Sequence, residues 1–196
     1  EPSPEMVDEA VARFFGKGIE VVVGVGGGSV LDAAKAIAGF LGNPGDPLDY
    51  LEVVGRGRAL EHRAAPWLAI PTTAGTGSEA QSYCVISDAK THMKMACGDK
   101  KAACRIAILD PELTLSMPAS VTSATGIDAI SHALESYVTT RRNPVSQLFA
   151  RRAWRLLAQG FPVVTSHKTA DSATANVASN DAEVMLAARG AMLLGA

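Results

Sequence analysis

The hydrophobic and polar positions of this sequence predict alternating helices and strands in its first part. In residues 6–15, apolar side chains recur with helical spacing, and Gly16 and Gly18 then end the pattern. Residues 19–25 form a β-branched run with almost no polar alternation, which is typical of a strand buried on both faces of a parallel sheet. We therefore expect a helix followed by a central strand.

A change of period follows three consecutive glycines at residues 26–28. Apolar residues then recur about every 3.6 positions as far as Leu41, before Gly42 and Pro44. This pattern predicts a strand, a tight turn and a helix. Further short apolar runs predict additional strands at residues 67–70, 83–86, 94–97 and 106–109. Such a succession indicates an α/β layer domain.

Strand signals largely end after Pro118. Helical periodicity covers residues 120–137, 145–159 and 181–194, with Pro144 and Pro162 at expected breaks and residues 167–180 as an expected loop. We place the domain boundary within residues 111–118. The expected organisation is an α/β domain over residues 1–115 and an all-helical domain over residues 116–196.

Composition and charge narrow the class of partner. The sequence is 47% hydrophobic, and its 18 basic and 20 acidic residues give a formal charge of −2. This balance offers no electrostatic footprint for nucleic acid or an anionic membrane, so small substrates fit better. No apolar run reaches the roughly 18 residues of a spanning helix. Three cysteines without Cys-x-x-Cys spacing favour a reducing cytoplasm.

The glycine turn is a candidate phosphate site. Without Cβ atoms, the backbone N–H groups of residues 26–28 can approach a phosphate where a helix begins. Ser29 and Asp32 have the spacing of a capping box, with Ser29 as the helix cap. The alternative is a purely structural turn that lets strand and helix pack closely. The segment is not the six-residue Gly-x-Gly-x-x-Gly fingerprint, so both interpretations stay open.

A threonine-rich loop follows the strand at residues 67–70. Residues 71–79 read Pro-Thr-Thr-Ala-Gly-Thr-Gly-Ser-Glu, which provides hydroxyls for the ribose and phosphate oxygens of a nucleotide. Loops at the carboxyl ends of parallel strands are where α/β sheets bind ligands. Thr76 and Glu79 also have capping-box spacing. A polar surface loop without a ligand is the alternative.

Asp128 and His132 are four residues apart on an expected helix. They therefore differ by about 40° in azimuth and about 6 Å in rise, and both can reach one ion. Mixed oxygen and nitrogen ligands suit Fe(II) or Zn(II) better than Mg(II) or Ca(II). Glu135 could lie nearby. The alternative is a surface pair joined by a local hydrogen bond.

Three blocks together resemble the iron-containing, group III alcohol dehydrogenases, whose relatives include zinc-using glycerol dehydrogenases. They are Gly-Gly-Gly-Ser-Val-Leu-Asp-Ala-Ala-Lys at residues 26–35, Ala-Ile-Pro-Thr-Thr-Ala-Gly-Thr-Gly-Ser-Glu at residues 69–79, and Ala-Thr-Gly-Ile-Asp-Ala-Ile-Ser-His-Ala-Leu-Glu at residues 124–135. Asp-Pro-Glu-Leu at residues 110–113 supports the match. The likeness runs over about residues 17–160.

The resemblance implies a Rossmann-like dinucleotide-binding α/β domain followed by an all-helical domain, with both domains incomplete in this chain. It implies NAD or NADP as cofactor, Fe(II) or Zn(II) as metal, a small alcohol or aldehyde as substrate, and a homo-oligomer. The implied cofactor-binding residues are Gly27, Gly28, Ser29, Thr72, Thr73, Thr76 and Lys94. The implied metal ligands are Asp128 and His132.

Two departures from the family pattern set limits to these expectations. No residue here matches the family's N-terminal βα unit, whose acidic residue reads the ribose 2′-hydroxyl, so NAD and NADP are not separated. No residue matches the third and fourth ligands, both histidines, and we assign His62, His92 and His167 to surface or structural roles. The rival interpretations are a non-catalytic fragment and a relative of the dehydroquinate synthase type.

Overall fold

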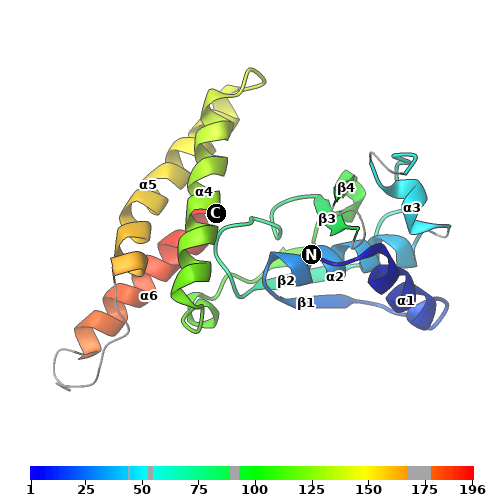
Figure 1. Ribbon diagram of the computed structural model, residues 1–196, viewed down its shortest axis with the longest axis horizontal. Coiled ribbons are helices and arrows are strands. Elements are labelled where there is room, and N and C mark those ends of the chain that lie inside the picture. The colour runs from blue at the N-terminus through cyan, green and yellow to red at the C-terminus, as the bar shows by residue number, and fades with distance from the viewer. Residues whose placement is uncertain (44, 53–54, 89–92, 167–177) are drawn as a thin grey trace. The chain divides into compact units, whose positions relative to one another are not determined.

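The computed structural model describes residues 1–43, 45–52, 55–88, 93–166 and 178–196 (Figure 1). Its contacts divide the chain into two compact units. The first unit comprises Glu1–Pro71 and Ser78–Ile108, and the second comprises Thr72–Gly77 and Leu109–Ala196. The threonine-rich loop therefore packs with the helical unit, although the strand before it belongs to the α/β unit.

A three-stranded parallel sheet forms the centre of the first unit. Its order is β1 (Val22–Gly26), β2 (Trp67–Pro71) and β5 (Ile106–Ala107). Helix α2 (Gly28–Leu41) covers one face, where its aliphatic side chains join Trp67 and Ala69 in a buried cluster. A Cβ on Gly24 would lie 2.9 Å from the Cβ of Ala34, so the absence of a side chain lets α2 approach the strand. The predicted strand, turn and helix are confirmed.

The prediction of a central strand at residues 19–25, buried on both faces, is wrong. The strand begins at Val22 and lies at one edge of the three-stranded sheet. Val23 and Val25 are 53% and 54% exposed, because α2 covers only the opposite face of β1 within the described residues. A run of apolar residues allows both faces of a strand to be buried. Whether they are buried depends on which elements pack against the strand.

A separate antiparallel hairpin packs on the other side of α2. It consists of β3 (Tyr83–Ser87) and β4 (Lys94–Gly98), and it confirms the strands predicted at residues 83–86 and 94–97. The remaining elements of this unit are α1 (Pro4–Phe14), α3 (Pro47–Tyr50) and the 3-10 turn η1 (Lys100–Ala102). Their core includes Val7, Phe40, Ile86 and Met95. The strand predicted at residues 106–109 is shorter, at Ile106–Ala107.

A buried lysine connects α2 to the segment after β2. Lys35 is fully buried, and its Nζ donates to the Ser78 carbonyl at 2.8 Å, to the Ser78 hydroxyl at 3.2 Å and to the Tyr83 carbonyl. Its ammonium also lies 3.5 Å from the carboxylate of Asp32. Asp32 in turn accepts from the Ser78 hydroxyl and, at 3.0 Å, from the backbone N–H of Val85. Burial lowers the pKa of Lys35, while the nearby Asp32 carboxylate opposes that shift.

The second unit is helical. A 3-10 turn, η2 (Pro111–Thr114), precedes α4 (Ala119–Val138), α5 (Pro144–Ser166) and α6 (Ala178–Gly195). Alanines on α4 pack with Leu157 of α5 and Met192 of α6 in a second buried cluster. The three predicted helices are confirmed; α4 and α6 extend slightly beyond their predicted bounds, and α5 continues to Ser166, past its predicted end at residue 159. No helix among the described residues is long and apolar enough to cross a membrane.

Pro162 does not end a helix, contrary to the prediction, but lies inside α5. Two side-chain hydroxyls bond to backbone carbonyls in the last turn of α5. Thr165 donates to the Phe161 carbonyl at 2.7 Å, and Ser166 donates to the Pro162 carbonyl at 2.5 Å. Close packing on α6 holds the helix here, since a Cβ on Gly160 would lie 2.7 Å from the Ala188 carbonyl oxygen. Tertiary contacts thus outweigh the local cost of proline. Most of the loop predicted at residues 167–180 lies outside the described residues.

We expect Lys35→Met to destabilise the protein by about 3–5 kcal/mol, because it leaves the Asp32 carboxylate and two carbonyl groups without their buried donor. Urea unfolding followed by circular dichroism measures the loss. Lys17→Met is the matched control: Lys17 is exposed, so its replacement should change stability by no more than about 0.5 kcal/mol. Equal effects of the two substitutions would contradict the role given to the buried lysine.

Candidate functional site

The glycine turn joins the end of β1 to the start of α2. β1 ends at Gly26, Gly27 is the N-cap residue, and α2 begins at Gly28. A Cβ on Gly26 would lie 2.7 Å from the Cβ of Val30, which is closer than real Cβ contacts come. The turn therefore requires glycine for packing, as the structural alternative proposed, and it also presents a helix N-terminus at the carboxyl end of a parallel strand.

The first N–H groups of α2 have no hydrogen-bond acceptor within the helix. Val30 and Leu31 donate to the Gly27 carbonyl at 3.0 and 3.1 Å, and they are the first residues of the helix to make such bonds. The N–H groups of Gly28 and Ser29 precede them, and no side chain in the described part of the chain caps the helix. Unpaired amides together with the positive end of the helix dipole suit a phosphate group. The turn therefore fits the pyrophosphate of a dinucleotide.

The capping box predicted for Ser29 and Asp32 is wrong. The chain enters the helix at Gly27, so Ser29 is already in the first turn, where it is exposed. Asp32 is buried and its carboxylate bonds to Ser78 and Val85. Groups that are distant in sequence therefore bind the Asp32 carboxylate, which the local spacing had assigned to a helix cap.

The threonine-rich loop packs against helix α4 within the second unit. Ala74 is buried in one cluster with Ala129 and Ala133 of that helix. A Cβ on Gly75 would lie 2.2 Å from the carbonyl oxygen of Thr125, so the two backbones are in direct contact. Thr72, Thr73 and Thr76 are half-buried beside this contact. The loop and the helix that carries the candidate metal ligands are thus held together.

No helix follows Thr76, so the capping box predicted for Thr76 and Glu79 is also wrong. Residues 78–80 form a turn instead. Glu79 is buried in the first unit, and this burial raises the pKa of its carboxyl group. Its backbone carbonyl accepts a hydrogen bond from the Cys104 thiol at 3.0 Å. The glutamate belongs to the interior and not to a helix end.

Gly75→Ala should separate the loop from α4, because the new methyl group would overlap the Thr125 backbone. We expect a loss of about 1–3 kcal/mol in the free energy of unfolding, measured by urea titration. Gly39→Ala is the matched control, since its Cβ would lie 3.7 Å from the nearest atom, Leu60 Cδ1. Inside α2 this substitution should stabilise by up to about 1 kcal/mol. Losses of similar size at both positions would contradict the packing argument.

Asp128 and His132 lie on the same side of α4. The His132 Nε2 and the Asp128 Oδ1 are 3.6 Å apart, and the side chains are 40% and 50% exposed. This distance is too long for a good hydrogen bond. It is close to the separation of about 3.4 Å expected for two ligands at about 2.1 Å from one tetrahedral ion. The distance is compatible with a shared ion, and the role of the pair as metal ligands stays a prediction.

Two donors do not complete a metal site. Within the part of the chain that the structure describes, no group of three or more His, Cys, Asp or Glu side chains could hold an ion. Glu135 is on the same helix and exposed, but it forms no such group with Asp128 and His132. A metal ion at this pair would need further ligands from outside the described residues.

Lys94 and the histidines other than His132 lie apart from the Asp128–His132 pair in sequence. Lys94 lies in β4, where its Nζ is 2.6 Å from the Glu1 carboxylate, and its role at the cofactor stays a prediction. The exposed His62 bonds only through its backbone, donating to the Asn43 side chain at 2.7 Å and accepting from it at 3.0 Å. His92 and His167 lie outside the described residues.

Sequence reasoning missed the buried partners of the turn and the loop. Lys35 and Asp32 were read as part of a family motif and a cap, while the structure buries both of them around Ser78. The available signal was an Asp-x-x-Lys pair on a helix that is otherwise apolar, where charges need partners. A second missed residue is Arg189 of α6, which is buried and donates to the Thr122 hydroxyl of α4 at 3.0 Å.

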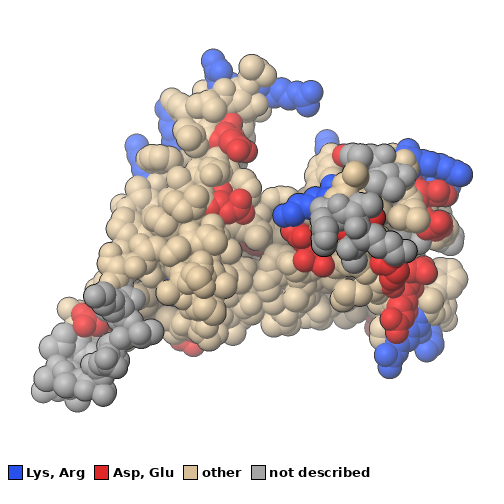
Figure 2. Space-filling model, in the orientation of Figure 1, with Lys and Arg blue, Asp and Glu red and all other residues tan. Residues whose placement is uncertain are grey.

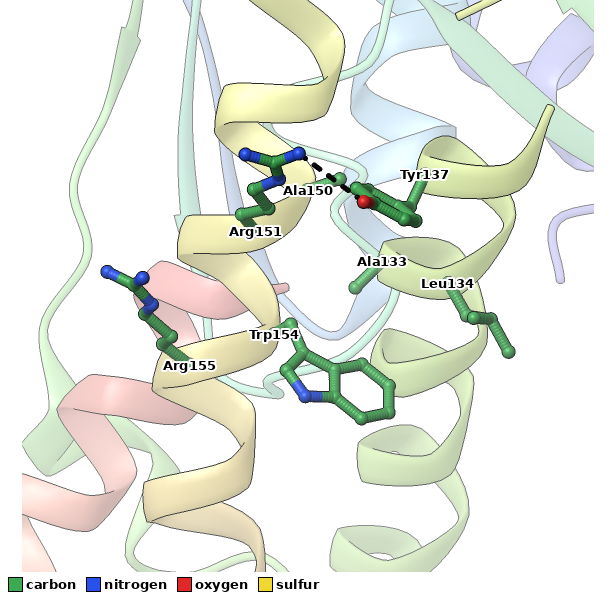
Figure 3. A pocket seen from close by; sticks show the side chains of 7 residues that line it. All are labelled: Ala133, Leu134, Tyr137, Ala150, Arg151, Trp154 and Arg155. Carbon is green, nitrogen blue, oxygen red and sulfur yellow. Dashed lines mark hydrogen bonds between the residues drawn. The ribbon is translucent and has the colours of Figure 1, made fainter. Parts of the chain in front are cut away.

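An apolar groove of about 280 Å³ lies between α4 and α5 (Figure 3). Arg151 borders it and donates to the Tyr137 hydroxyl at 3.4 Å. Basic side chains gather on the helical unit near the end of α4 and the start of α5 (Figure 2). Residues 136–166 contain five arginines and no acidic residue. The groove residues Ala133, Leu134 and Tyr137 are rotated by about 100–200° from His132 around the helix. The groove is therefore separate from the Asp128–His132 pair.

Comparison with known proteins identifies the family. A model of the iron-containing alcohol dehydrogenases matches residues 1–111, and a model of the C-terminal region of the Fe-containing alcohol dehydrogenase family matches residues 122–193. This chain belongs to the iron-containing alcohol dehydrogenase family. The predicted resemblance is thereby confirmed.

Similar curated proteins act on several alcohols. An NAD-dependent methanol dehydrogenase of Bacillus methanolicus is 41% identical over 162 residues, which is 83% of this chain and 42% of that protein. A 1-propanol dehydrogenase of Citrobacter freundii is 37% identical over 166 residues, which is 85% of this chain and 40% of that protein. The chain thus spans less than half the length of these relatives.

Solved structures confirm the fold class. A sulfoacetaldehyde reductase from Bifidobacterium kashiwanohense in complex with NAD+ matches with a TM-score of 0.82 and 29% identity, over 99% of this chain and 48% of that one. An iron-containing alcohol dehydrogenase from Thermotoga maritima matches with a TM-score of 0.79 and 32% identity, again over 99% and 48%. The first unit is accordingly Rossmann-like, and a helical unit follows it.

Proposed function

We propose that this chain carries the nucleotide turn and two metal ligands of an alcohol dehydrogenase that interconverts a small alcohol and its aldehyde or ketone, with NAD or NADP as hydride acceptor. The observation that carries the proposal is the placement of Asp128 and His132 on one side of α4, 3.6 Å apart. The threonine-rich loop packs on the same helix. Family membership supports the reaction class.

Asp128 and His132 would hold the metal, with Fe(II) or Zn(II) suited to one carboxylate and one imidazole ligand. When bound, such an ion supplies Lewis acidity that lowers the pKa of an alcohol. The two side chains lie on a helix that Ala129 and Ala133 anchor in the core. A rigid helix fixes the direction of both ligands, so little order has to be created when an ion binds.

The residues of this chain would hold the cofactor in position. The amides of Gly28 and Ser29, at the uncapped start of α2, would bind the pyrophosphate without adding charge. The half-buried Thr72, Thr73 and Thr76 would donate hydroxyls to the nucleotide. We assign no catalytic base to this chain, because the proposed chemistry needs none from these residues.

Asp128→Ala and His132→Ala should each weaken metal binding at least tenfold, since either substitution leaves a single ligand. Both residues are half-exposed, so stability should change by no more than about 0.5 kcal/mol. Calorimetry with Zn(II), together with the metal content of the purified protein, measures the effect. Glu135→Ala on the same helix is the control and should bind as the parent does. Parental affinity in either ligand variant would remove the assignment.

Ser29→Glu should weaken NAD or NADP binding about tenfold or more, because a carboxylate in the first turn of α2 repels the pyrophosphate. An acidic residue in a first turn favours the helix itself, so the fold is retained. The matched control is Ser120→Glu, also exposed at the second position of its helix, α4. Titration of both variants with each nucleotide separates the two positions. Equal affinities would place the pyrophosphate elsewhere.

The non-catalytic fragment remains the second candidate, because no third metal ligand lies among the described residues. The decisive assay measures alcohol-dependent NAD(P)H formation by the 196-residue polypeptide with added Fe(II) or Zn(II). Metal-dependent turnover that the Asp128→Ala substitution abolishes supports the dehydrogenase. Nucleotide binding without turnover at any metal concentration supports the fragment.

A further inference from the structure

Two of the three cysteines face each other across the β3–β4 hairpin. Cys84 and Cys97 are direct partners in the antiparallel register, so their side chains lie on the same face. Both are buried, with 3% and 8% of their surface exposed. Neither thiol belongs to the turn, the loop or the ligand pair described above.

The backbone around this pair allows the two sulfurs to meet. Val85 and Ala96 form the next pair along the hairpin. The Val85 N–H donates to Asp32 and the Ala96 carbonyl accepts from the Glu52 N–H, so these groups point away from the facing strand and Val85–Ala96 is a non-hydrogen-bonded pair. Because the two kinds of pair alternate, Cys84 and Cys97 occupy a hydrogen-bonded pair with Cα atoms about 5.5 Å apart. Disulfides span Cα separations of about 4.4–6.8 Å. The Cα separation thus lies within the disulfide range. The Cβ atoms of a hydrogen-bonded pair lie up to about 5.5 Å apart, against about 3.5–4.5 Å in a disulfide, so the strands must approach by about 1 Å for the bridge to close.

The two thiols are chemically unequal. The Cys84 thiol donates to the backbone carbonyl of Cys97 at 3.4 Å. The interaction between the two side chains raises the pKa of Cys84 and lowers that of Cys97. Burial and the Cys97 charge raise the pKa of Cys84 further. The thiolate, and not the thiol, is the nucleophile in cysteine chemistry. Cys97 is also the more exposed of the two, at 8% against 3% for Cys84, so we take Cys97 as the attacking sulfur and Cys84 as the resolving one.

We propose that Cys84 and Cys97 form a redox-active dithiol that a hydroperoxide oxidises to a disulfide. The Cys97 thiolate attacks the peroxide oxygen, the O–O bond breaks, and the leaving hydroxide takes up a proton to give water and a Cys97 sulfenic acid. The Cys84 sulfur then attacks the Cys97 sulfur and displaces hydroxide, which takes the Cys84 proton and leaves as water. Two thiols and one hydrogen peroxide thus give one disulfide and two waters.

The bridge would form beside the buried lysine of the first unit. Cys84 lies between Tyr83, whose carbonyl accepts from Lys35, and Val85, whose N–H donates to Asp32. A disulfide at Cys84 would tie β4 to the strand that holds these two charged groups. Oxidation would thereby fasten the hairpin at the point where it contacts α2.

Cys104 provides an internal control. Its thiol donates to the Glu79 carbonyl at 3.0 Å, and burial raises its pKa. It therefore has neither a thiol partner of the kind seen in the hairpin nor a favoured thiolate. Peroxide should leave Cys104 reduced under conditions that oxidise the other two.

The experiment treats the folded protein with hydrogen peroxide, blocks remaining thiols with N-ethylmaleimide and maps the peptides by mass spectrometry. We expect a Cys84–Cys97 disulfide that dithiothreitol reverses, with Cys104 alkylated. Cys104→Ser should form the disulfide at the parental rate. Cys97→Ser should slow peroxide consumption at least tenfold, because the thiolate is lost.

Three results would overturn the proposal, and all are readable in the unsubstituted protein. The first is a disulfide that includes Cys104. The second is overoxidation of Cys97 to a sulfinic acid without a bridge to Cys84. The third is a Cys84–Cys97 disulfide that appears only after unfolding in urea. Circular dichroism of each variant, compared with the parent, shows that a slower reaction reflects the missing thiol and not lost structure.

Discussion

The α/β unit depends on the complete satisfaction of one buried charge. Lys35 has no exposed surface, yet each direction of its ammonium group meets an acceptor from Ser78, Tyr83 or Asp32. A buried cation without such partners is strongly unfavourable, so helix α2, the turn after the threonine-rich loop and the β3–β4 hairpin must assemble together. The interaction acts less as a source of net stability than as a condition on how these three segments meet.

This condition explains how the chain places its candidate chemistry. Holding α2 against the hairpin fixes the helix whose uncapped N-terminus follows the glycine turn. Lys35 also holds Ser78 within the first unit. Within the second unit, the threonine-rich loop packs on α4 through Ala74 and Gly75. Each unit therefore carries its own part: the amides of a helix start in the first, and a carboxylate–imidazole pair in the second. In both, residues without bulky side chains allow the close backbone approach that the site requires.

The same hairpin also carries chemistry that the family motifs do not contain. Cys84 follows the residue that accepts from Lys35 and precedes the residue that donates to Asp32, so its position is set by the same anchoring. Its partner Cys97 is thirteen residues away in sequence, and only strand register brings the two sulfurs together. A site can thus arise as a by-product of packing around a buried charge, without a local sequence signature.

The sequence by itself determined the elements whose signals are local. Periodicity located the helices, β-branched runs located the strands, and a separation of four residues placed Asp128 and His132 on one helix side. Tertiary structure alone decided the partners of Asp32 and Lys35, the exposure of Val23 and Val25, and the continuation of α5 through Pro162. The physical reason is distance along the chain: Lys35 meets partners 43 and 48 residues away, and no local pattern encodes which distant group will complete a buried charge or cover a strand.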